Sequence, residues 1–166
     1  EIEYFQFDNE HTMLSAFVDW WEQPYHMPDI ITGWNSRFFD IQYLVNRLAR
    51  VLGEDETRRL SPWKMIDSRS VKIKGREQVT FDITGIQSLD YMDLFKKFAY
   101  TYGNQESYSL NHISHVVLGD EKLDYSDVGT FMETYENDHQ RFIDYNIKDV
   151  ELVHRIDEKL GLIDLV

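Results

Sequence analysis

One carboxylate lies where the sequence pattern calls for an apolar side chain. Apolar residues recur at helical spacing from about Asp138 to Leu160, and Asp149 lies within this stripe. It follows Tyr145 by four residues and precedes Val153 by four. Burying a carboxylate costs free energy unless it is paired, hydrogen-bonded or bound to a metal ion. Asp149 is therefore a member of a structural ion pair, a cap for another backbone segment, or a cation ligand, and its position alone favours a structural role.

Asp40 raises the same question. It follows the run Gly33-Trp34-Asn35-Ser36 at the end of a predicted strand, one turn before Leu44 on the core-facing side of the next predicted helix. Carboxylates that converge from distant parts of a chain, at strand ends and helix starts, hold hard divalent cations. An acid in the first turn of a helix also interacts favourably with the helix dipole. Taken alone, Asp40 favours the interaction with the helix dipole.

The composition restricts the class of protein. The chain has 166 residues, of which 42% are hydrophobic and 14% aromatic, enough for one domain with a sizeable core. It contains no cysteine, which excludes disulfides, thiolate zinc sites and cysteine nucleophiles. Thirty acidic against seventeen basic residues give a net charge of −13, which repels phosphate backbones. Any contact with nucleic acid would therefore depend on metal ions, stacking or neighbouring domains.

The elements that must position the two aspartates follow from hydrophobic periodicity and turn residues. Interleaved helices and strands predict an α/β domain. Asn35 or Ser36 is expected to cap the helix that carries Asp40. The predicted helices are 10–22, 41–52, 91–100, 109–118 and 138–160. The predicted strands are 4–7, 29–34 and 88–90, of which 29–34 is expected to be buried. A hairpin is expected from strands 71–74 and 79–84 around the turn Gly75-Arg76-Glu77, with Lys72, Lys74 and Arg76 near its tip.

Several motifs together resemble the exonuclease region of family B DNA polymerases, most closely those of T-even-type bacteriophages. Thr32-Gly33-Trp34-Asn35 followed by Phe39-Asp40 resembles the second exonuclease motif of that family. Tyr145-Asn146-Ile147-Lys148-Asp149 resembles the third, with its Tyr-x-x-x-Asp spacing. Leu89–Phe98 and Tyr108-Ser109-Leu110 are similar to the segments between them. The resemblance covers essentially the whole chain.

The resemblance implies a ribonuclease H-like exonuclease fold, with residues 1–166 as one domain and a hairpin insertion at about 69–85. It implies a DNA-directed DNA polymerase whose exonuclease removes mismatched nucleotides from the primer 3′ end. In that family four carboxylates hold two divalent ions, Mg²⁺ or Mn²⁺. By resemblance Asp40 and Asp149 are metal ligands, and Tyr145 orients the attacking water or the scissile phosphate. By the same resemblance, Trp34, Asn35 and Phe39 hold the terminal nucleotide. Lys122 lies where these enzymes have an active-site lysine.

The family's first motif, an Asp-x-Glu on the first strand, is expected to be missing. Asp8-Asn9-Glu10 looks like it, but the interval to Asp40 is too short for the strands that the family fold needs there. Glu10 also suits the start of a helix. We therefore expect a fragment of the exonuclease domain that lacks the first strands and is nearly inactive by itself. A compact nuclease that uses Asp8 and Glu10, or a non-catalytic acidic protein-interaction module, is the alternative.

The expected partners follow from the resemblance. They are the 3′ end of single-stranded DNA or of a primer–template duplex, and the rest of the polymerase chain. No stretch approaches the roughly 20 apolar residues of a membrane span, so no membrane partner is expected. The exposed sheet edge of a fragment could pair with a second copy to form a homodimer. For a phage protein the expected location is the host cell cytoplasm.

Overall fold

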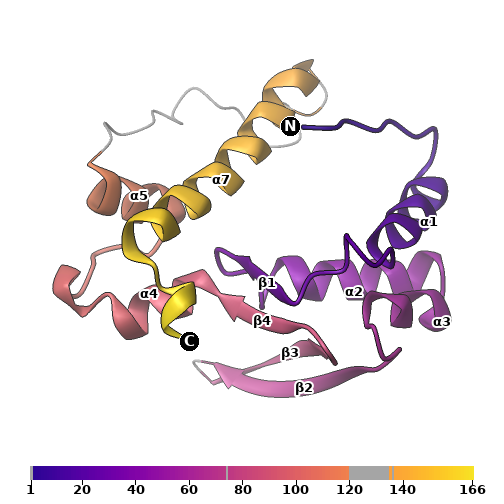
Figure 1. Ribbon diagram of the computed structural model, residues 1–166, viewed down its shortest axis with the longest axis horizontal. Helices are drawn as coiled ribbons and strands as arrows, with labels where there is room; N and C mark the ends of the chain where they lie inside the picture. Colours follow the sequence, from indigo (N-terminus) through magenta and orange to yellow (C-terminus); the bar gives the residue numbers. More distant parts are fainter. Residues whose placement is uncertain (1, 74, 120–134, 136) are drawn as a thin grey trace. The chain divides into compact units, whose positions relative to one another are not determined.

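The first half of the chain contains both helices and strands (Figure 1). The computed structural model describes residues 2–73, 75–119, 135 and 137–166, and its contacts divide the chain into an N-terminal unit, Glu1–Asp90, and a C-terminal unit, Tyr91–Val166. The N-terminal unit contains α1 (Glu10–Trp21), β1 (Ile30–Gly33), α2 (Asp40–Val51), α3 (Glu54–Thr57), η1 (Arg58–Leu60), β2 (Ile66–Ile73), β3 (Arg76–Ile83) and β4 (Gln87–Asp90). The predicted mixed α/β class is confirmed.

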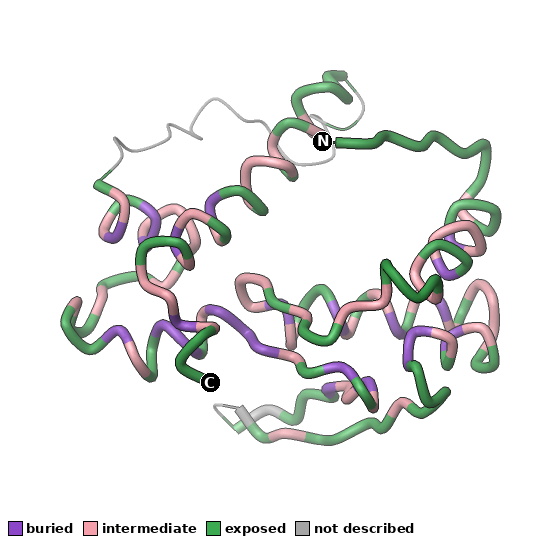
Figure 2. The backbone as a smooth tube through the Cα atoms, in the orientation of Figure 1, coloured by how far each residue is buried: buried purple, intermediate pink, exposed green. Residues whose placement is uncertain are grey.

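Two small sheets form the β-structure of the N-terminal unit. Strands β1 and β4 are parallel, in a register that pairs Gly33 with Asp90, so both strands end at the same edge. Strands β2 and β3 form the predicted hairpin, but they are longer than expected and are mostly exposed (Figure 2). Ile73 pairs with Arg76, so the predicted three-residue turn is wrong. A two-residue connection matches strand twist when glycine supplies a positive φ, and Gly75 has φ 81°.

The core of the N-terminal unit lies between α1, α2 and the end of η1. Val18, Leu48 and Leu60 are completely buried there. The indole Nε1 of Trp21 donates to the carbonyl oxygen of Leu60 at 3.0 Å, which joins α1 to η1. The stripe that predicted α2 is confirmed, since its buried residues are Ile41, Val45 and Leu48.

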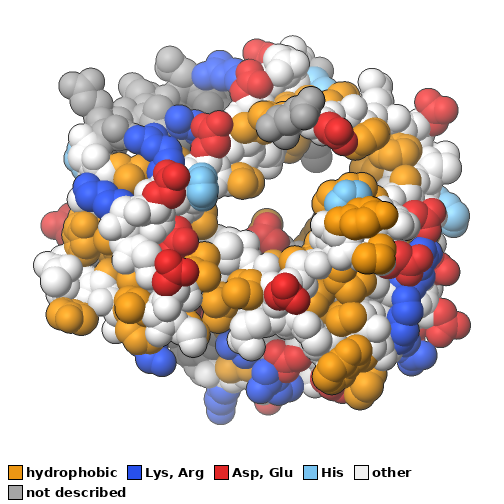
Figure 3. All heavy atoms as spheres, in the orientation of Figure 1, with side chains coloured by type: hydrophobic (Ala, Val, Ile, Leu, Met, Phe, Trp, Pro, Cys, Tyr) orange, Lys and Arg blue, Asp and Glu red, His pale blue; other side chains and the backbone are white. Residues whose placement is uncertain are grey.

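An ion-pair cluster also joins α1 to η1 and α3. The guanidinium of Arg59 contacts the carboxylates of Asp19 in α1, of Glu22 immediately after α1, and of Glu56 in α3. These hydrogen bonds raise the pKa of Arg59 above its usual range. Figure 3 shows basic and acidic side chains side by side over α1 and α3, towards the right of the view. The pairing explains how part of the acidic surface is neutralised locally.

Four local predictions for this unit are wrong. Residues 4–7 form no strand, because they have no strand partner within the described residues. Strand β1 is only half-buried, because the sheet that contains it has just one other described strand. Neither Asn35 nor Ser36 caps α2, which begins at Asp40 after Phe39 without a side-chain cap. Asp40 is exposed there and does not lie on the buried face.

The described part of the C-terminal unit is helical. It contains α4 (Tyr91–Phe98), η2 (Tyr100–Tyr102), α5 (Leu110–Leu118), α7 (His139–Leu160) and η3 (Ile163–Leu165). The helix ends agree with the sequence. Ser109 caps α5, Asp138 caps α7, and Gly161 ends α7 in the left-handed conformation that favours glycine. The most buried residues of the described part of this unit are Tyr91, Phe95, Ile113, Val117, Leu152 and Ile156.

Three hydrogen bonds attach the end of α7 to its neighbours in the C-terminal unit. The buried Tyr91 hydroxyl donates to Oδ1 of Asp157 at 2.9 Å, and the backbone N–H of Ile163 donates to the same oxygen at 3.3 Å. The ammonium of Lys159 donates to the carbonyl oxygen of Val117 in α5. The position of α7 within its unit is therefore fixed by polar contacts as well as by packing.

Within the described residues, no helix combines the length and the apolar character needed to cross a membrane.

Candidate active site

The turn between β1 and α2 is held by one buried carboxylate. Asp90 ends β4 beside Gly33 and is 5% exposed. Its Oδ1 accepts the backbone N–H of Asn35 and its Oδ2 accepts that of Arg37, each at 3.1 Å. Both donors lie in the turn that leads to Asp40. Backbone N–H groups in an irregular turn need such acceptors when they are buried.

Two residue types of this turn are set by the backbone. A Cβ at Gly33 would lie 2.9 Å from the Cβ of Ser36, closer than side-chain carbons approach one another. Asn35 has φ 62°, in the left-handed region that asparagine tolerates better than most residues with a side chain. Ser36 is buried under this turn. The glycine and the asparagine are therefore needed for the chain path, whatever else the asparagine does.

Asp40 is the first residue of α2, with its carboxylate exposed at the helix start. Nearby protein atoms limit its hydration and thereby raise the pKa of Asp40; its own backbone N–H opposes this, and the charge of Asp90 raises the pKa further. Phe39, immediately before it, is 68% exposed, and Trp34 is half-buried. A negative group and an exposed aromatic ring thus lie together at the end of the turn.

Asp149 and Tyr145 lie one turn apart on α7, and both are half-buried. Burial raises the pKa of Asp149. Burial, followed by the nearby charge of Asp149, raises the pKa of Tyr145, so its hydroxyl keeps its proton at neutral pH. The ion pairs recorded within the described residues do not include Asp149. They therefore give no support to the structural ion-pair interpretation.

The structure thus groups the predicted residues into two sets. Trp34, Asn35, Phe39 and Asp40 lie in the N-terminal unit, and Tyr145 and Asp149 lie in the C-terminal unit. Lys122 falls outside the described residues. Where the structure describes the chain, no three histidine, aspartate or glutamate side chains converge in a way that could hold a metal ion.

Comparison with known proteins identifies the family. The sequence profile of the DNA polymerase family B exonuclease domain matches residues 1–113. The chain belongs to this family. It is 41% identical over 163 residues to the DNA-directed DNA polymerase of Enterobacteria phage T4, and 41% identical over 165 residues to that of Escherichia phage RB69. The catalytic subunit of rice DNA polymerase delta is 28% identical over 177 residues.

These matches cover 98%, 99% and 96% of the chain, respectively. The chain spans 18% of each phage polymerase and 15% of the rice subunit. The exonuclease domain of this family has a ribonuclease H-like fold, and the mixed α/β structure agrees with it. The chain is therefore related to a defined part of much longer polymerases.

Glu10 is held by a side chain of α2, that of Arg47. It begins α1, where Asn9 caps the helix by accepting the backbone N–H of Thr12 at 2.9 Å. Both carboxylate oxygens of Glu10 accept hydrogen bonds from the guanidinium of Arg47 in α2, and these bonds lower the pKa of Glu10. A carboxylate held by an arginine on both oxygens is poorly available to a cation. This arrangement favours the interpretation of Asp8-Asn9-Glu10 as a helix start.

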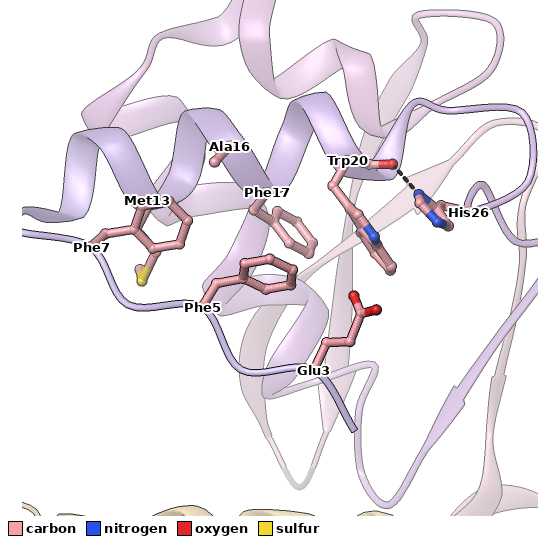
Figure 4. A pocket seen from close by; sticks show the side chains of 8 residues that line it. All are labelled: Glu3, Phe5, Phe7, Met13, Ala16, Phe17, Trp20 and His26. Carbon is pink, nitrogen blue, oxygen red and sulfur yellow. Dashed lines mark hydrogen bonds between the residues drawn. The ribbon is translucent and has the colours of Figure 1, made fainter. Parts of the chain in front are cut away.

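A large cavity of the N-terminal unit does not involve the predicted site residues. It has a volume of about 630 Å³ and lies between the chain before α1 and α1 itself (Figure 4). Phe5 and Glu3 extend from the preceding segment towards Phe17 and Trp20, and His26 bonds the carbonyl oxygen of Trp20. The complete lining is Glu3, Phe5, Phe7, Met13, Ala16, Phe17, Trp20 and His26. This mainly apolar lining does not suit a phosphate or a cation.

Asp90 was not predicted as a site residue. It lies in a segment similar to the family, and the predicted strand 88–90 ends on it. The available signal was an acidic residue at the end of a mostly buried strand, which is the pattern that drew attention to Asp40. What the sequence could not provide was the pairing with Gly33, which brings Asp90 beside the turn.

Proposed function

We propose that this chain is part of a proofreading exonuclease that hydrolyses nucleotides from the 3′ end of a primer strand. The observation that carries the proposal is the match of residues 1–113 to the exonuclease domain of family B DNA polymerases. The motif aspartates Asp40 and Asp149 lie at the start of α2 and in α7, and Tyr145 lies one turn before Asp149. The larger protein is proposed to be a DNA-directed DNA polymerase, because the chain is similar to 18% of the length of two phage proteins of that kind.

The two aspartates suit a divalent cation by their chemistry. Carboxylate oxygens are the ligands that Mg²⁺ and Mn²⁺ prefer. The environments of Asp40 and Asp149 disfavour an isolated negative charge, so a nearby cation would relieve that cost. We propose that they supply two of the four carboxylates of a two-metal site. Such ions, when bound, lower the pKa of water and stabilise the leaving oxygen.

The other residues would bind and orient the DNA end. The Tyr145 hydroxyl would donate a hydrogen bond to the attacking water or to an oxygen of the scissile phosphate, and its raised pKa keeps that proton available. The exposed ring of Phe39 offers a surface on which a base can stack. Trp34 and Asn35 would contact the same terminal nucleotide, and Lys122 would act as a cation beside the phosphate.

The proposed partners are the DNA 3′ end and the rest of the polymerase, in the cytoplasm of the host. We also propose that the isolated chain can dimerise, because β1 and β4 are the only strands of their sheet in the described part of the chain. Sedimentation at micromolar concentration tests this, and a purely monomeric mass would contradict it. The organisation of residues 1–166 as one exonuclease domain remains a proposal as well.

The test is an exonuclease assay on 3′-labelled single-stranded DNA with Mg²⁺ or Mn²⁺. It compares the polymerase that contains this segment with the isolated chain, each as wild type, Asp149→Ala and Glu10→Ala. Asp144→Ala is the matched control, because Asp144 is an exposed aspartate on the same helix. In the polymerase, we expect Asp149→Ala to lose more than the roughly 10–100-fold typical of groups that only support a metal ligand. The two other variants should keep the activity, and the isolated chain should remain near background.

The alternatives predict different outcomes. Full activity of the Asp149→Ala polymerase would refute the proposal. Activity of the isolated chain that is lost in both Asp149→Ala and Glu10→Ala would instead establish a compact nuclease that uses Asp8 and Glu10. An acidic interaction module predicts that Mn²⁺ binding to the isolated chain is the same with and without Asp149. Titration of the chain with Mn²⁺ therefore completes the test.

A further inference from the structure

Asp90 occupies an unusual position for a carboxylate. It is 5% exposed, and each of its oxygens accepts a different backbone N–H at 3.1 Å, those of Asn35 and Arg37. Burying a carboxylate is costly unless hydrogen bonds compensate. These bonds join positions more than fifty residues apart, 55 for Asn35 and 53 for Arg37. The residue therefore connects the end of β4 to the turn after β1.

A neutral side chain could not make the same pair of bonds. Asparagine presents one acceptor oxygen and one NH₂ group, and the NH₂ group would face a backbone N–H donor. Alanine would leave both donors of the turn without this acceptor. Only a carboxylate of this length offers an acceptor to both N–H groups at once.

The turn that Asp90 holds has little conformational freedom. Gly33 lies against Ser36 with no room for a Cβ, and Asn35 is in the left-handed region. The turn leads directly into α2, and the carbonyl oxygen of Ser36 accepts the N–H of Ile41 at 2.9 Å. The path of residues 33–39 therefore sets where α2 begins, and Asp40 is its first residue.

We propose that Asp90 is a positioning residue for Asp40, which holds the β1–α2 turn so that the Asp40 carboxylate meets a divalent cation. Asp90 acts through the backbone, because each of its oxygens accepts an N–H of the turn and the side chain is only 5% exposed. This inference rests on the proposed function, since it assigns Asp40 a cation. What it adds is that the cation site at Asp40 depends on Asp90, a residue outside the exonuclease motifs.

The test compares Asp90→Asn with Ser61→Ala. Ser61 is a matched control in the same unit, because its buried hydroxyl also accepts a backbone N–H, that of Trp63 at 3.1 Å, and donates to the carbonyl oxygen of Thr84 at 2.6 Å. Hydrogen exchange of the Asn35 and Arg37 amides is measured in the chain. Exonuclease kinetics are measured in the polymerase as a function of Mn²⁺ and DNA concentration.

In Asp90→Asn we expect faster exchange at one or both amides, and a rise of about 10–100-fold in the Mn²⁺ concentration for half-maximal activity, as for other groups that orient metal ligands. The KM for DNA should change little, because the nucleotide contacts remain. Ser61→Ala should change neither amide exchange in the turn nor the Mn²⁺ requirement. Unchanged exchange and Mn²⁺ dependence in Asp90→Asn would overturn the inference, and so would an equal Mn²⁺ effect in Ser61→Ala.

The result is separable from the proposed function. If Asp149→Ala abolishes exonuclease activity while Asp90→Asn behaves as wild type, only the positioning role is lost. If Asp149→Ala leaves the polymerase fully active, the proposed function fails, and the positioning role falls with it. The amide exchange would still show whether Asp90 holds the turn.

Discussion

Replacing Tyr91 with phenylalanine removes one hydroxyl from the centre of the C-terminal unit. Tyr91 has no exposed surface, and its hydroxyl donates to Oδ1 of Asp157 at 2.9 Å. Phenylalanine keeps the ring and its packing. The variant therefore removes the hydrogen bond from α4 to α7, together with the bond between this hydroxyl and the backbone of Leu162. The Asp157 oxygen keeps only the longer bond from Ile163, at 3.3 Å.

The size of the effect follows from the charge of the acceptor. A hydrogen bond to an ionised group contributes about 1.5–3 kcal/mol, more than one between neutral groups, because a partly buried charge loses a donor. We expect the free energy of unfolding to fall by about 2 kcal/mol in Tyr91→Phe. Tyr100→Phe is the control, since Tyr100 is 82% exposed and its change should stay within about 0.5 kcal/mol.

Urea denaturation can assign the loss to the correct unit. All four tryptophans lie in Glu1–Asp90, so their fluorescence follows the N-terminal unit, whereas far-ultraviolet circular dichroism also follows α4, α5 and α7. With a urea dependence of about 2 kcal/mol per molar, the dichroism midpoint should fall by about 1 M. If Tyr91→Phe shifts this midpoint no more than Tyr100→Phe, the Asp157 bond does not stabilise the unit as argued.

Three other outcomes are expected. Hydrogen bonds from Arg59, with a smaller effect from Lys64, lower the pKa of Glu22 from 4.5 to about 2. The stability that results is complete above pH 4.5 and is lost as the pH falls towards 2. Between these pH values, the denaturation of Glu22→Gln should therefore depend less on pH than that of the wild type or of the exposed control Glu54→Gln. Burial raises the pKa of Asp149 above 3.8, so protonation favours the folded state and stability falls as pH rises through this range; Asp149→Asn should melt at a higher temperature than wild type at pH 7 but not at pH 3. Asn35→Gly should fold, because glycine also adopts the left-handed backbone conformation of Asn35. A higher KM for DNA in the variant polymerase would show that the Asn35 amide contacts a nucleotide, and unchanged kinetics would exclude that contact.

The helices could be predicted from the sequence because their signals are local. Asn9, Ser109, Asp138 and Gly161 lie within one or two residues of the observed helix ends, and each acts through its own segment. The stripe of α2 likewise depends only on the spacing of its apolar residues. Such features need no knowledge of what lies elsewhere in the fold.

The strands were less predictable because a strand needs a partner. Residues 4–7 have the aromatic composition of a strand, yet they pair with no other described segment. The length of the β2–β3 hairpin was underestimated because polar residues such as Asp67 and Ser68 extend the ladder, opposite Asp82 and Phe81. A hairpin that is mostly exposed does not need apolar alternation along its whole length.

The candidate site shows the same division between local and long-range information. Asp40 and Asp149 were predicted because each interrupts a pattern in its own segment. Asp90 also ends a predicted strand, but its importance depends on the parallel pairing of β4 with β1, which no local pattern encodes. Within the motif itself, Gly33 and Asn35 satisfy the backbone of a turn, whereas Phe39 is free to contact a ligand. The motif therefore contains residues of two kinds. Gly33 and Asn35 are needed for the backbone of the turn, and Phe39 is available for contact with a ligand.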